Sequence, residues 1–285
     1  MCNHERVLHF AKGHGTRNDF VLLTDPDDAL DLTPQFVSFL CDRRGGIGGD
    51  GVLRVVRGAH VEGWGGDPEV WFMDYRNADG SIAEMCGNGV RVFARHLVDE
   101  GLVEPETRTI PIGTRAGLRE AELLDDGRVR VWMGRPELTA GTHPTVAMDE
   151  TDWTAYQVNV GNPHAVIPLG QEHDLLALDL TGSPSVDPVD YPDGVNVEFV
   201  EQVSERHVRM RVWERGVGET ESCGTGTVAV AVAMAEHEGV ATEPTTWTID
   251  VPGGTVEVEL RDGQAWLTGP AVIVARGDVA VPEPR

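Results

Sequence analysis

The sequence contains a single lysine, Lys12, although 23 of its 285 residues are basic. Arginine therefore carries nearly all of the positive charge, and the formal net charge is −24. A surface this acidic repels nucleic acid and anionic membranes, so neither is expected as a partner. It also suits a cytosol rich in salt, where screening shortens electrostatic repulsion to about 3 Å at 1 M. Biased codon use would equally replace lysine by arginine.

The sequence also lacks a secretion signal and a membrane-spanning segment. Its first ten residues, MCNHERVLHF, do not show the charged, apolar and small-residue order of a signal peptide. The longest apolar run, Val228–Ala235, is too short to cross a bilayer. We therefore expect a cytoplasmic protein that is not anchored to a membrane.

Cysteine is scarce, and the four residues present contain no C-x-x-C pair: Cys2, Cys41, Cys86 and Cys223. Their wide spacing in a cytosolic protein argues against both a disulfide framework and a zinc ribbon. Any chemistry that they carry out is therefore expected to be thiol chemistry. Cys2 and Cys41 are expected to be small core residues, which is the usual role of an isolated cysteine.

Cys86 and Cys223 differ from the other two because they lie in a repeated motif, x-C-G-[NT]-G-x, at Met85–Val90 and Ser222–Thr227. A helical pattern follows each copy. Apolar residues recur at spacings of three and four from Val90 to Val98, which predicts a helix with one buried stripe that stops at Gly101. The run from Val228 is apolar on all sides, which predicts a helix enclosed by other elements, with a buried strand as the competing interpretation.

The similarity of the two regions extends upstream of the cysteines. Nine residues before them stand Asn77 and Glu214, each after an alternating segment that predicts a strand. Farther upstream, Asn18–Leu23 and Asn162–Ile167 each combine a polar turn with an apolar strand. Two homologous halves are the simplest explanation.

The predicted fold is α/β, of the α+β type, with two pseudo-symmetric halves. Many short strands separated by Gly and Asp turns, with one helix per half, predict a strongly curved mixed sheet wrapped around a central helix in each half. Residues 1–130 would form the half that carries Cys86, and residues 131–270 the half that carries Cys223. The last strand, about 271–285, would return to the first half.

A cysteine at the start of a helix is a chemically useful thiol. Backbone N–H groups and the positive end of the helix dipole lie beside the sulfur, which favours the thiolate. A free thiol has a pKa near ~8.5, and helix N-termini are among the settings that lower it. The neighbouring glycines would let a substrate carboxylate approach the N–H groups.

Two such thiols are suited to inverting a stereocentre. Inversion needs a proton removed from one face of a carbon and delivered to the other, and two groups related by pseudo-twofold symmetry can do this in either direction. One cysteine must then be a thiolate while the other is a thiol. The repeat therefore predicts a cofactor-independent amino-acid epimerase that uses Cys86 and Cys223.

Other polar and glycine-rich segments can be explained by structural roles alone. His164 is equally well explained as a hydrogen-bonded turn residue. Glu214 and Arg215 could form a surface pair, apart from the register that Glu214 shares with Asn77. The segment Gly45–Gly51 lacks the Lys-Ser/Thr ending of a phosphate loop and is interpreted as a turn-rich wall of the substrate site.

Taken together, these motifs resemble the diaminopimelate epimerase family. The resemblance runs in order along nearly the whole chain, through Asn18–Phe20, Gly48–Gly51, Arg76–Ser81, Met85–Gly89, Gly161–His164, Gly194–Phe199, Glu214–Gly216 and Glu221–Thr227. Members of this family interconvert LL- and meso-2,6-diaminoheptanedioate on the route to lysine and, in many bacteria, peptidoglycan. The resemblance implies two α/β halves facing across a cleft that holds the active site, an amino-acid substrate, and neither pyridoxal phosphate nor a metal. It leaves the oligomeric state open, with a homodimer as one candidate.

The resemblance also implies a role for each matching position. Cys86 and Cys223 would be the catalytic pair, with His164 and Glu214 adjusting the cysteines and orienting the reacting ammonium. The carboxylate at the reacting centre would be held by Gly87, Asn88, Gly224 and Thr225. The polar ends of the substrate would be read by Asn18, Asn77, Asn162, Asn196 and Arg215. Some members place Gln at the position of Gly51, so that contact is lost here, taken over by backbone or moved elsewhere.

Two alternatives involve the same cysteines. Another two-cysteine racemase, acting on proline or hydroxyproline, should lack the amides that would read a distal amino-acid group. A thiol switch without enzymatic activity would oxidise Cys86 and Cys223 to a disulfide that reports redox state.

Overall fold

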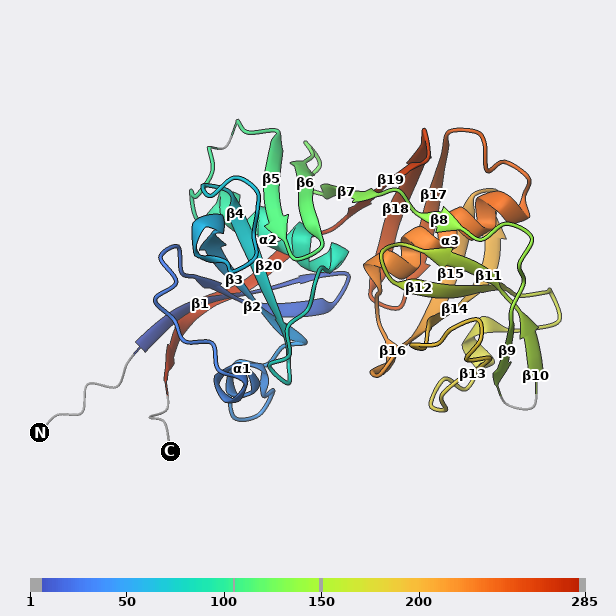
Figure 1. Cartoon of the computed structure of the whole chain (residues 1–285), viewed down its shortest axis with the longest axis horizontal. Helices are drawn as coiled ribbons and strands as arrows, with labels where there is room; N and C mark the ends of the chain where they lie inside the picture. Colours follow the sequence, from blue (N-terminus) through green and yellow to red (C-terminus); the bar gives the residue numbers. More distant parts are fainter. Residues whose placement is uncertain (1–6, 105, 149–150, 282–285) are drawn as a thin grey trace, which may run out of the picture. The chain divides into compact units, whose positions relative to one another are not determined.

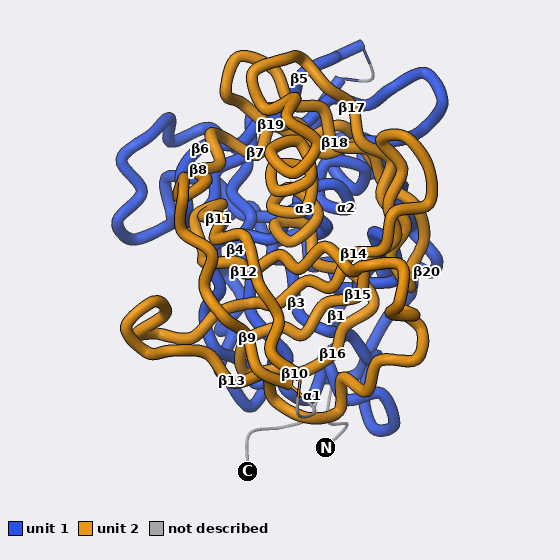
Figure 2. The backbone as a smooth tube through the Cα atoms, turned by 90° about the vertical axis from the view of Figure 1, so that its right-hand side faces the viewer, with its two compact units in different colours: residues 1–129, 270–285 blue, residues 130–269 orange. Residues whose placement is uncertain are grey.

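The computed structural model describes residues 7–104, 106–148 and 151–281. Within these ranges the protein is mixed α/β, consisting mostly of strands with three α-helices (Figure 1). None of the helices in the described ranges is long and apolar enough to cross a membrane. Cys2, expected in the core, lies outside the described residues. The chain divides into two compact units: residues 1–129 with 270–285 (unit 1) and residues 130–269 (unit 2; Figure 2).

Unit 1 contains strands β1–β6 and β20 with helices α1 and α2. Their bounds are β1 Val7–Gly15, β2 Asn18–Thr24, α1 Pro34–Cys41, β3 Gly51–Arg57, β4 Trp71–Asn77, α2 Gly87–Asp99, β5 Thr109–Thr114, β6 Gly117–Leu123 and β20 Val272–Ala280, with a 3-10 turn at Gly58–His60. Strand β1 pairs antiparallel with both β2 and β20, β2 runs parallel to β3, and β3 is antiparallel to β4. Strand β4 then pairs parallel with β5, and β5 antiparallel with β6.

Helix α2 lies against strands from several parts of this unit, namely β1, β2, β3, β5, β6 and β20. Its predicted stop is confirmed: Gly101 has a φ of +65°, and Leu102 N donates to Leu97 O at 2.8 Å. The prediction of one buried stripe was too narrow. Arg91 and His96 on the other sides are also buried, at 0% and 2% exposed, because strands pack on those sides as well.

Unit 2 contains strands β7–β19 and helix α3. Their bounds are β7 Val129–Gly134, β8 Glu137–Leu138, β9 Thr145–Met148, β10 Thr151–Thr154, β11 Tyr156–Asn159, β12 Pro163–Pro168, β13 Ser185–Val186, β14 Asn196–Ser204, β15 His207–Glu214, β16 Gly218–Thr220, α3 Gly224–His237, β17 Thr245–Val251, β18 Gly254–Arg261 and β19 Gln264–Gly269, with a 3-10 turn at Leu175–Ala177. Strands β9, β10 and β13 form a separate small sheet. Helix α3 packs against β11, β12, β14, β17, β18 and β19, with strands on several sides of it in Figure 2. The prediction of an enclosed helix, rather than a buried strand, is confirmed.

One pattern of strand pairing occurs in both units. In unit 1, β2 runs parallel to β3 with Phe20 opposite Gly51, and β3 is antiparallel to β4. In unit 2, β12 runs parallel to β14 with His164 opposite Asn196, and β14 is antiparallel to β15. Counting along these registers, Phe20 corresponds to His164 and Gly51 to Asn196. The last residues of β4 and β15 are Asn77 and Glu214, the pair that the sequence had matched.

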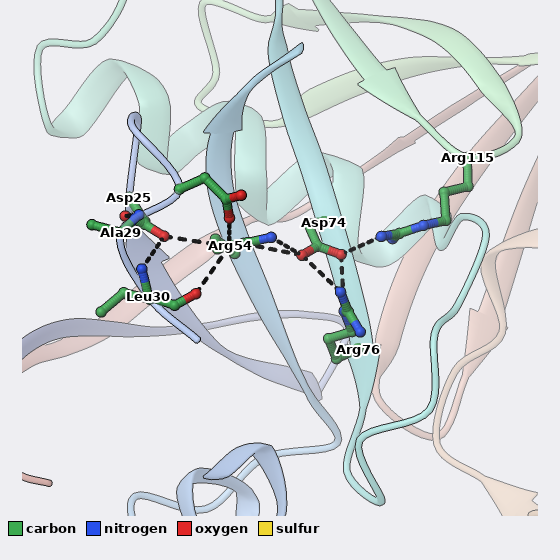
Figure 3. Close-up of polar contacts among 8 residues, drawn as sticks. Asp25, Ala29, Leu30, Arg54, Asp74, Arg76 and Arg115 are labelled. Carbon is green, nitrogen blue, oxygen red and sulfur yellow. Dashed lines mark hydrogen bonds and ion pairs between the residues drawn. The ribbon is translucent and has the colours of Figure 1, made fainter. Parts of the chain in front are cut away.

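Unit 1 also buries a cluster of charged side chains between β3 and β4 (Figure 3). Asp74, 0% exposed, accepts from Arg54 at 2.7 Å, Arg76 at 2.9 Å and Arg115 at 2.6 Å. Arg54 also pairs with Asp25 at 3.4 Å and with Asp28. Burial acts to raise the pKa of Asp74, but the hydrogen bond from Arg76 and the other two arginine charges outweigh it and hold that pKa below its usual value.

Candidate active site

Cys86 and Cys223 are both N-cap residues, one of α2 and the other of α3. Their backbones are extended, with φ of −140° at Cys86 and −121° at Cys223. Each sulfur accepts a hydrogen bond from the N–H three residues later, from Gly89 at 3.5 Å and from Gly226 at 3.4 Å. The thiol thereby takes the place of the oxygen in a normal N-cap side chain.

The amide of Asn18 lies beside Cys86. The Cys86 thiol donates to Asn18 Oδ1 at 3.4 Å, and the Asn88 amide donates to the same oxygen at 3.3 Å. Asn18 Nδ2 donates in turn to Asp50 Oδ2 at 2.8 Å, so the amide oxygen is directed towards the thiol. Asp50 had no assigned role in the sequence analysis, although it follows Gly48 and Gly49 directly. It is held by Arg43 Nη2 at 2.8 Å.

Cys223 is buried beside a hydroxyl and a carboxyl group. Its sulfur lies 3.5 Å from Thr225 Oγ1, and Asn162 Nδ2 donates to that hydroxyl at 3.3 Å. Burial, followed by the negative charges of Glu214 and Glu198, raises the pKa of the Cys223 thiol well above its usual value. The Gly226 N–H at the helix end lowers the Cys223 pKa, as expected, but burial and the two carboxylates outweigh it, so the net effect disfavours the thiolate.

Glu214 is also shifted. Burial is the largest cause that raises the pKa of its carboxyl group, and the charge of Glu198 adds to it. Hydrogen bonds from Thr220 and Cys223 and the nearby His164 act in the opposite direction without cancelling the effect. Glu214 and Cys223 are thus direct neighbours: the hydrogen bond from Cys223 favours the Glu214 carboxylate, whereas the charge of that carboxylate disfavours the Cys223 thiolate.

His164 lies on β12 and is fully buried, not in an exposed turn. Its Nδ1 is 2.6 Å from Glu198 Oε1, and its Nε2 is 3.0 Å from Asn162 Oδ1. Glu198 is itself 0% exposed on β14. The sequence analysis did not single it out, although a glutamate inside the buried run Val197–Val200 was a usable signal.

Asn196 and Arg215 are joined through the backbone of unit 2. Asn196 Oδ1 accepts from the Arg215 N–H at 3.0 Å, and Asn196 Nδ2 donates to Pro163 O at 3.3 Å. Arg215 Nη1 donates to Asp193 O at 2.7 Å. In unit 1, the Asn77 amide at the end of β4 donates to Ser81 Oγ at 3.0 Å, which is a local turn contact.

Gly51 has no room for a side chain on this backbone. An added Cβ would lie 2.5 Å from the Arg76 carbonyl oxygen and 2.7 Å from a ring carbon of Tyr75. The corresponding position in unit 2 is Asn196, so an amide present there has no counterpart in unit 1.

The structure thus brings the predicted residues together as two groups, one in each unit. The first group contains Asn18, Cys86, Gly87 and Asn88, with Asn77 at the end of an adjacent strand. The second contains Asn162, His164, Asn196, Glu214, Arg215, Cys223, Gly224 and Thr225. Over the ranges that the structure describes, no group of three or more His, Cys, Asp or Glu side chains could hold a metal ion.

Substituting the third residue after each cysteine should have unequal effects. In Gly226→Ala, the new Cβ would lie 2.7 Å from Glu198 Oε1 and 3.2 Å from Cys223 Cβ. We expect this overpacking to lower the free energy of unfolding by about 1–3 kcal/mol. The matched variant Gly89→Ala meets its nearest atoms only at 3.5 Å, so its helix propensity should leave stability unchanged or raise it by up to about 1 kcal/mol. Urea unfolding of both proteins measures the difference, and equal losses would contradict the packing described here.

Comparison with known proteins agrees with the arrangement of these motifs. The diaminopimelate epimerase family model matches residues 10–139 and 156–280. The chain is 54% identical over 280 residues to the diaminopimelate epimerase of Streptomyces coelicolor (strain ATCC BAA-471 / A3(2) / M145), covering 95% of each. It is 49% identical over 281 residues to that of Corynebacterium glutamicum (strain ATCC 13032), covering 96% of this chain and 99% of the relative.

A solved structure adds a likeness of fold alone. A hydroxyproline epimerase from Agrobacterium vitis, with bound trans-4-hydroxy-L-proline, superimposes with a TM-score of 0.70 at 15% identity and covers 99% of this chain and 94% of its own. The family model and the close relatives are more specific than this fold and confirm the resemblance found in the sequence. The chain belongs to the diaminopimelate epimerase family.

Proposed function

We propose that this chain interconverts LL- and meso-2,6-diaminoheptanedioate by moving the α-proton between Cys86 and Cys223. Family membership supports the reaction, an isomerisation in lysine biosynthesis. The observation that carries the mechanism is the matched placement of the two thiols. Each is the N-cap of a helix, and each lies beside a polar group, Asn18 or Glu214.

The proposed geometry uses two pseudo-symmetric halves, residues 1–130 with 271–285 and residues 131–270. Each would be a strongly curved mixed sheet around its helix, and the active site would occupy the cleft between them. The common pairing of β2, β3 and β4 and of β12, β14 and β15 supports this proposal. The two sulfurs would then face one α-carbon from opposite sides.

The starts of α2 and α3 would bind the carboxylate at the reacting centre. Gly87 and Asn88 open α2, and Gly224 and Thr225 open α3, so their N–H groups lie at positive helix ends. When the α-proton leaves, negative charge grows on this carboxylate. Oriented N–H donors stabilise such charge by about 3–4 kcal/mol each in well-studied sites.

Proton transfer follows from the unequal environments of the two cysteines. Because burial and Glu214 raise the pKa of Cys223, that residue rests as the thiol and suits the acid role. In the direction that starts from this resting state, the Cys86 thiolate takes the α-proton. The Cys223 thiol delivers its own proton to the opposite face of the α-carbon. The site then holds a Cys86 thiol and a Cys223 thiolate, which suits the reverse reaction. His164 and Glu214 would adjust the cysteines and orient the ammonium group.

The amides around the two thiols would bind the rest of the substrate. Recognition of the polar ends, including the distal amino-acid group, would fall to Asn18, Asn77, Asn162, Asn196 and Arg215. We also propose that the protein forms a homodimer, which sedimentation of the purified protein tests. A cytoplasmic location is proposed as well, and cell fractionation tests it.

Incubation with LL-2,6-diaminoheptanedioate in deuterium oxide should yield the meso isomer with deuterium at one α-carbon. Proton delivery from a thiol in equilibrium with solvent requires this label. NMR and mass spectrometry of the product measure it, under reducing conditions and at both low and high salt because of the acidic surface. Proline and hydroxyproline are the matched substrates, and slow turnover is expected because they lack the distal group. Faster turnover of either one, or no exchange with any substrate, would reject the proposal.

A further inference from the structure

The residues packed behind the two cysteines differ in kind, although their positions correspond. In unit 1, a Cβ on Gly89 would meet Phe20 Cζ at 3.6 Å and Leu53 Cδ2 at 3.5 Å, which are the side chains behind the start of α2. Both are apolar and 0% exposed. The shared pairing registers of β2 with β3 and of β12 with β14 make His164 the counterpart of Phe20. They likewise make Glu198 the counterpart of Leu53.

The His164–Glu198 pair is expected to stabilise the fold less than two apolar side chains at the same positions. The two groups lie 2.6 Å apart, and neither has any solvent exposure. Glu198 Oε2 is buried without a hydrogen-bond partner among the described residues. A buried, incompletely satisfied ion pair is often less stabilising than well-packed apolar groups. Since Phe20 and Leu53 fill the same place in unit 1, the fold does not require the polar pair.

The polar pair is connected to Cys223 by a continuous chain of contacts. His164 Nε2 faces Asn162 Oδ1 at 3.0 Å, and Asn162 Nδ2 donates to Thr225 Oγ1 at 3.3 Å. Thr225 Oγ1 lies 3.5 Å from Cys223 Sγ. The Glu198 carboxyl group occupies Nδ1 of the ring, so Nε2 is the nitrogen that faces Asn162.

We propose that Glu198 is a positioning residue for epimerisation. Through Nδ1 it holds the His164 ring with its Nε2–H on Asn162, and this contact places the Asn162 amide and the Thr225 hydroxyl against Cys223. The apolar counterparts in unit 1 take no part in such a chain, and Asp50 holds the Asn18 amide beside Cys86 instead. Glu198 therefore contributes to a chemical difference between the two thiols. The catalytic part of this inference rests on the proposed function.

The charges around Cys223 agree with this assignment. After burial and Glu214, the charge of Glu198 is the next cause that raises the Cys223 pKa. The titratable groups that face this cluster are Glu214 from β15, Cys223 from α3, and Tyr191 from the segment before β14. Burial is the main cause that raises the pKa of Tyr191, followed by Asp190 and Glu198, so the Tyr191 phenol stays neutral at the pH of an assay.

Two variants of Glu198 separate its charge from its hydrogen bond. In Glu198→Gln, the amide can still donate to His164 Nδ1, so the ring keeps its Nε2–H and turnover should fall by less than about 10-fold. Glu198→Leu removes both functions, and kcat should fall about 10- to 100-fold with a smaller change in KM. Glu201→Gln is the matched control on the same strand, since Glu201 pairs with Arg209 at 3.2 Å outside the cluster.

The pH dependence distinguishes positioning from simple packing. Without the Glu198 charge, the Cys223 pKa falls, so the limb of the kcat/KM profile that depends on the Cys223 thiol should move to lower pH in Glu198→Gln. The same shift should appear in the rate at which iodoacetamide alkylates Cys223, measured by peptide mass spectrometry. Cys41, whose pKa is raised to about 11 mainly by burial, is the internal reference and should not move.

The double variant His164→Phe with Glu198→Leu recreates the apolar pair of unit 1. It should melt at or above the temperature of Glu198→Leu, yet remain as inactive. Recovery of turnover together with stability would show that only packing mattered and would overturn the proposal, as would wild-type kcat and pH profile in Glu198→Leu. The alkylation shift between wild type and Glu198→Gln does not depend on turnover. If the shift is present but the wild type is inactive, the proposed function alone is rejected. If the wild type is active but the shift is absent, the role of Glu198 is rejected.

Discussion

Cys86→Ser and Cys223→Ser should each lower the rate of epimerisation by about 10²- to 10⁴-fold, the usual contribution of a general acid or base. A serine hydroxyl is not ionised at neutral pH, so it cannot replace a thiolate that removes the α-proton. Each variant should be impaired in both directions, because each cysteine is the base in one direction and the acid in the other. Formation of the meso isomer and its deuterium content measure the effect.

The fold of both variants should survive, which makes the loss interpretable. Serine is among the preferred N-cap residues, so its oxygen can accept from the Gly89 or Gly226 N–H in place of sulfur. Cys41→Ser is the matched control. Cys41 is buried in the core of unit 1, and its loss should leave turnover near the wild-type value. Wild-type turnover in either of the first two variants would remove that cysteine from the mechanism.

Asp74→Asn should lower the free energy of unfolding by about 3–5 kcal/mol, a larger loss than that expected for Gly226→Ala. Asp74 is the only carboxylate in contact with Arg76 and Arg115 among the described ion pairs, and it also binds Arg54 (Figure 3). Removing one partner of a buried ion pair leaves the other charges buried and uncompensated. Urea unfolding followed by circular dichroism measures the loss.

The effect of Asp74→Asn should depend on pH in a defined direction. The folded protein holds the pKa of Asp74 below its usual value, so its contribution is complete above the unfolded pKa of about 3.9 and is lost as the pH falls through the folded pKa. The difference between wild type and variant should therefore narrow in acid. Asp126→Asn is the control, because Asp126 pairs with Arg128 at an exposed site and should change stability little. A similar loss in both variants would contradict the importance of the buried cluster.

The helices that carry the cysteines were predictable because their signals are local. The apolar spacing after Val90 and the glycine at position 101 define α2 without knowledge of its neighbours, and Gly101 does adopt a positive φ. The apolar run from Val228 predicts α3 in the same way. The repeated motif then identified the two thiols, and the order of motifs identified the family.

Local signals did not reveal what surrounds those helices. The prediction of a single buried stripe missed Arg91 and His96, because a helix pattern shows which side is apolar and not how many strands cover the others. Asp50 reaches Asn18, and Glu198 reaches His164, only through the parallel pairing of strands that are distant in the sequence.

The sequence by itself determined where the two thiols lie along the chain and which helices they cap, since capping and periodicity act over a few residues. The order of its motifs determined the family of the chain. Tertiary structure alone decided that Gly51 has no space for a side chain, that Glu198 stands behind Gly226, and that Cys223 rests as a thiol. The pKa of Cys223 depends on burial and on charges from β14 and β15, which chain folding brings to α3. No local pattern contains that information.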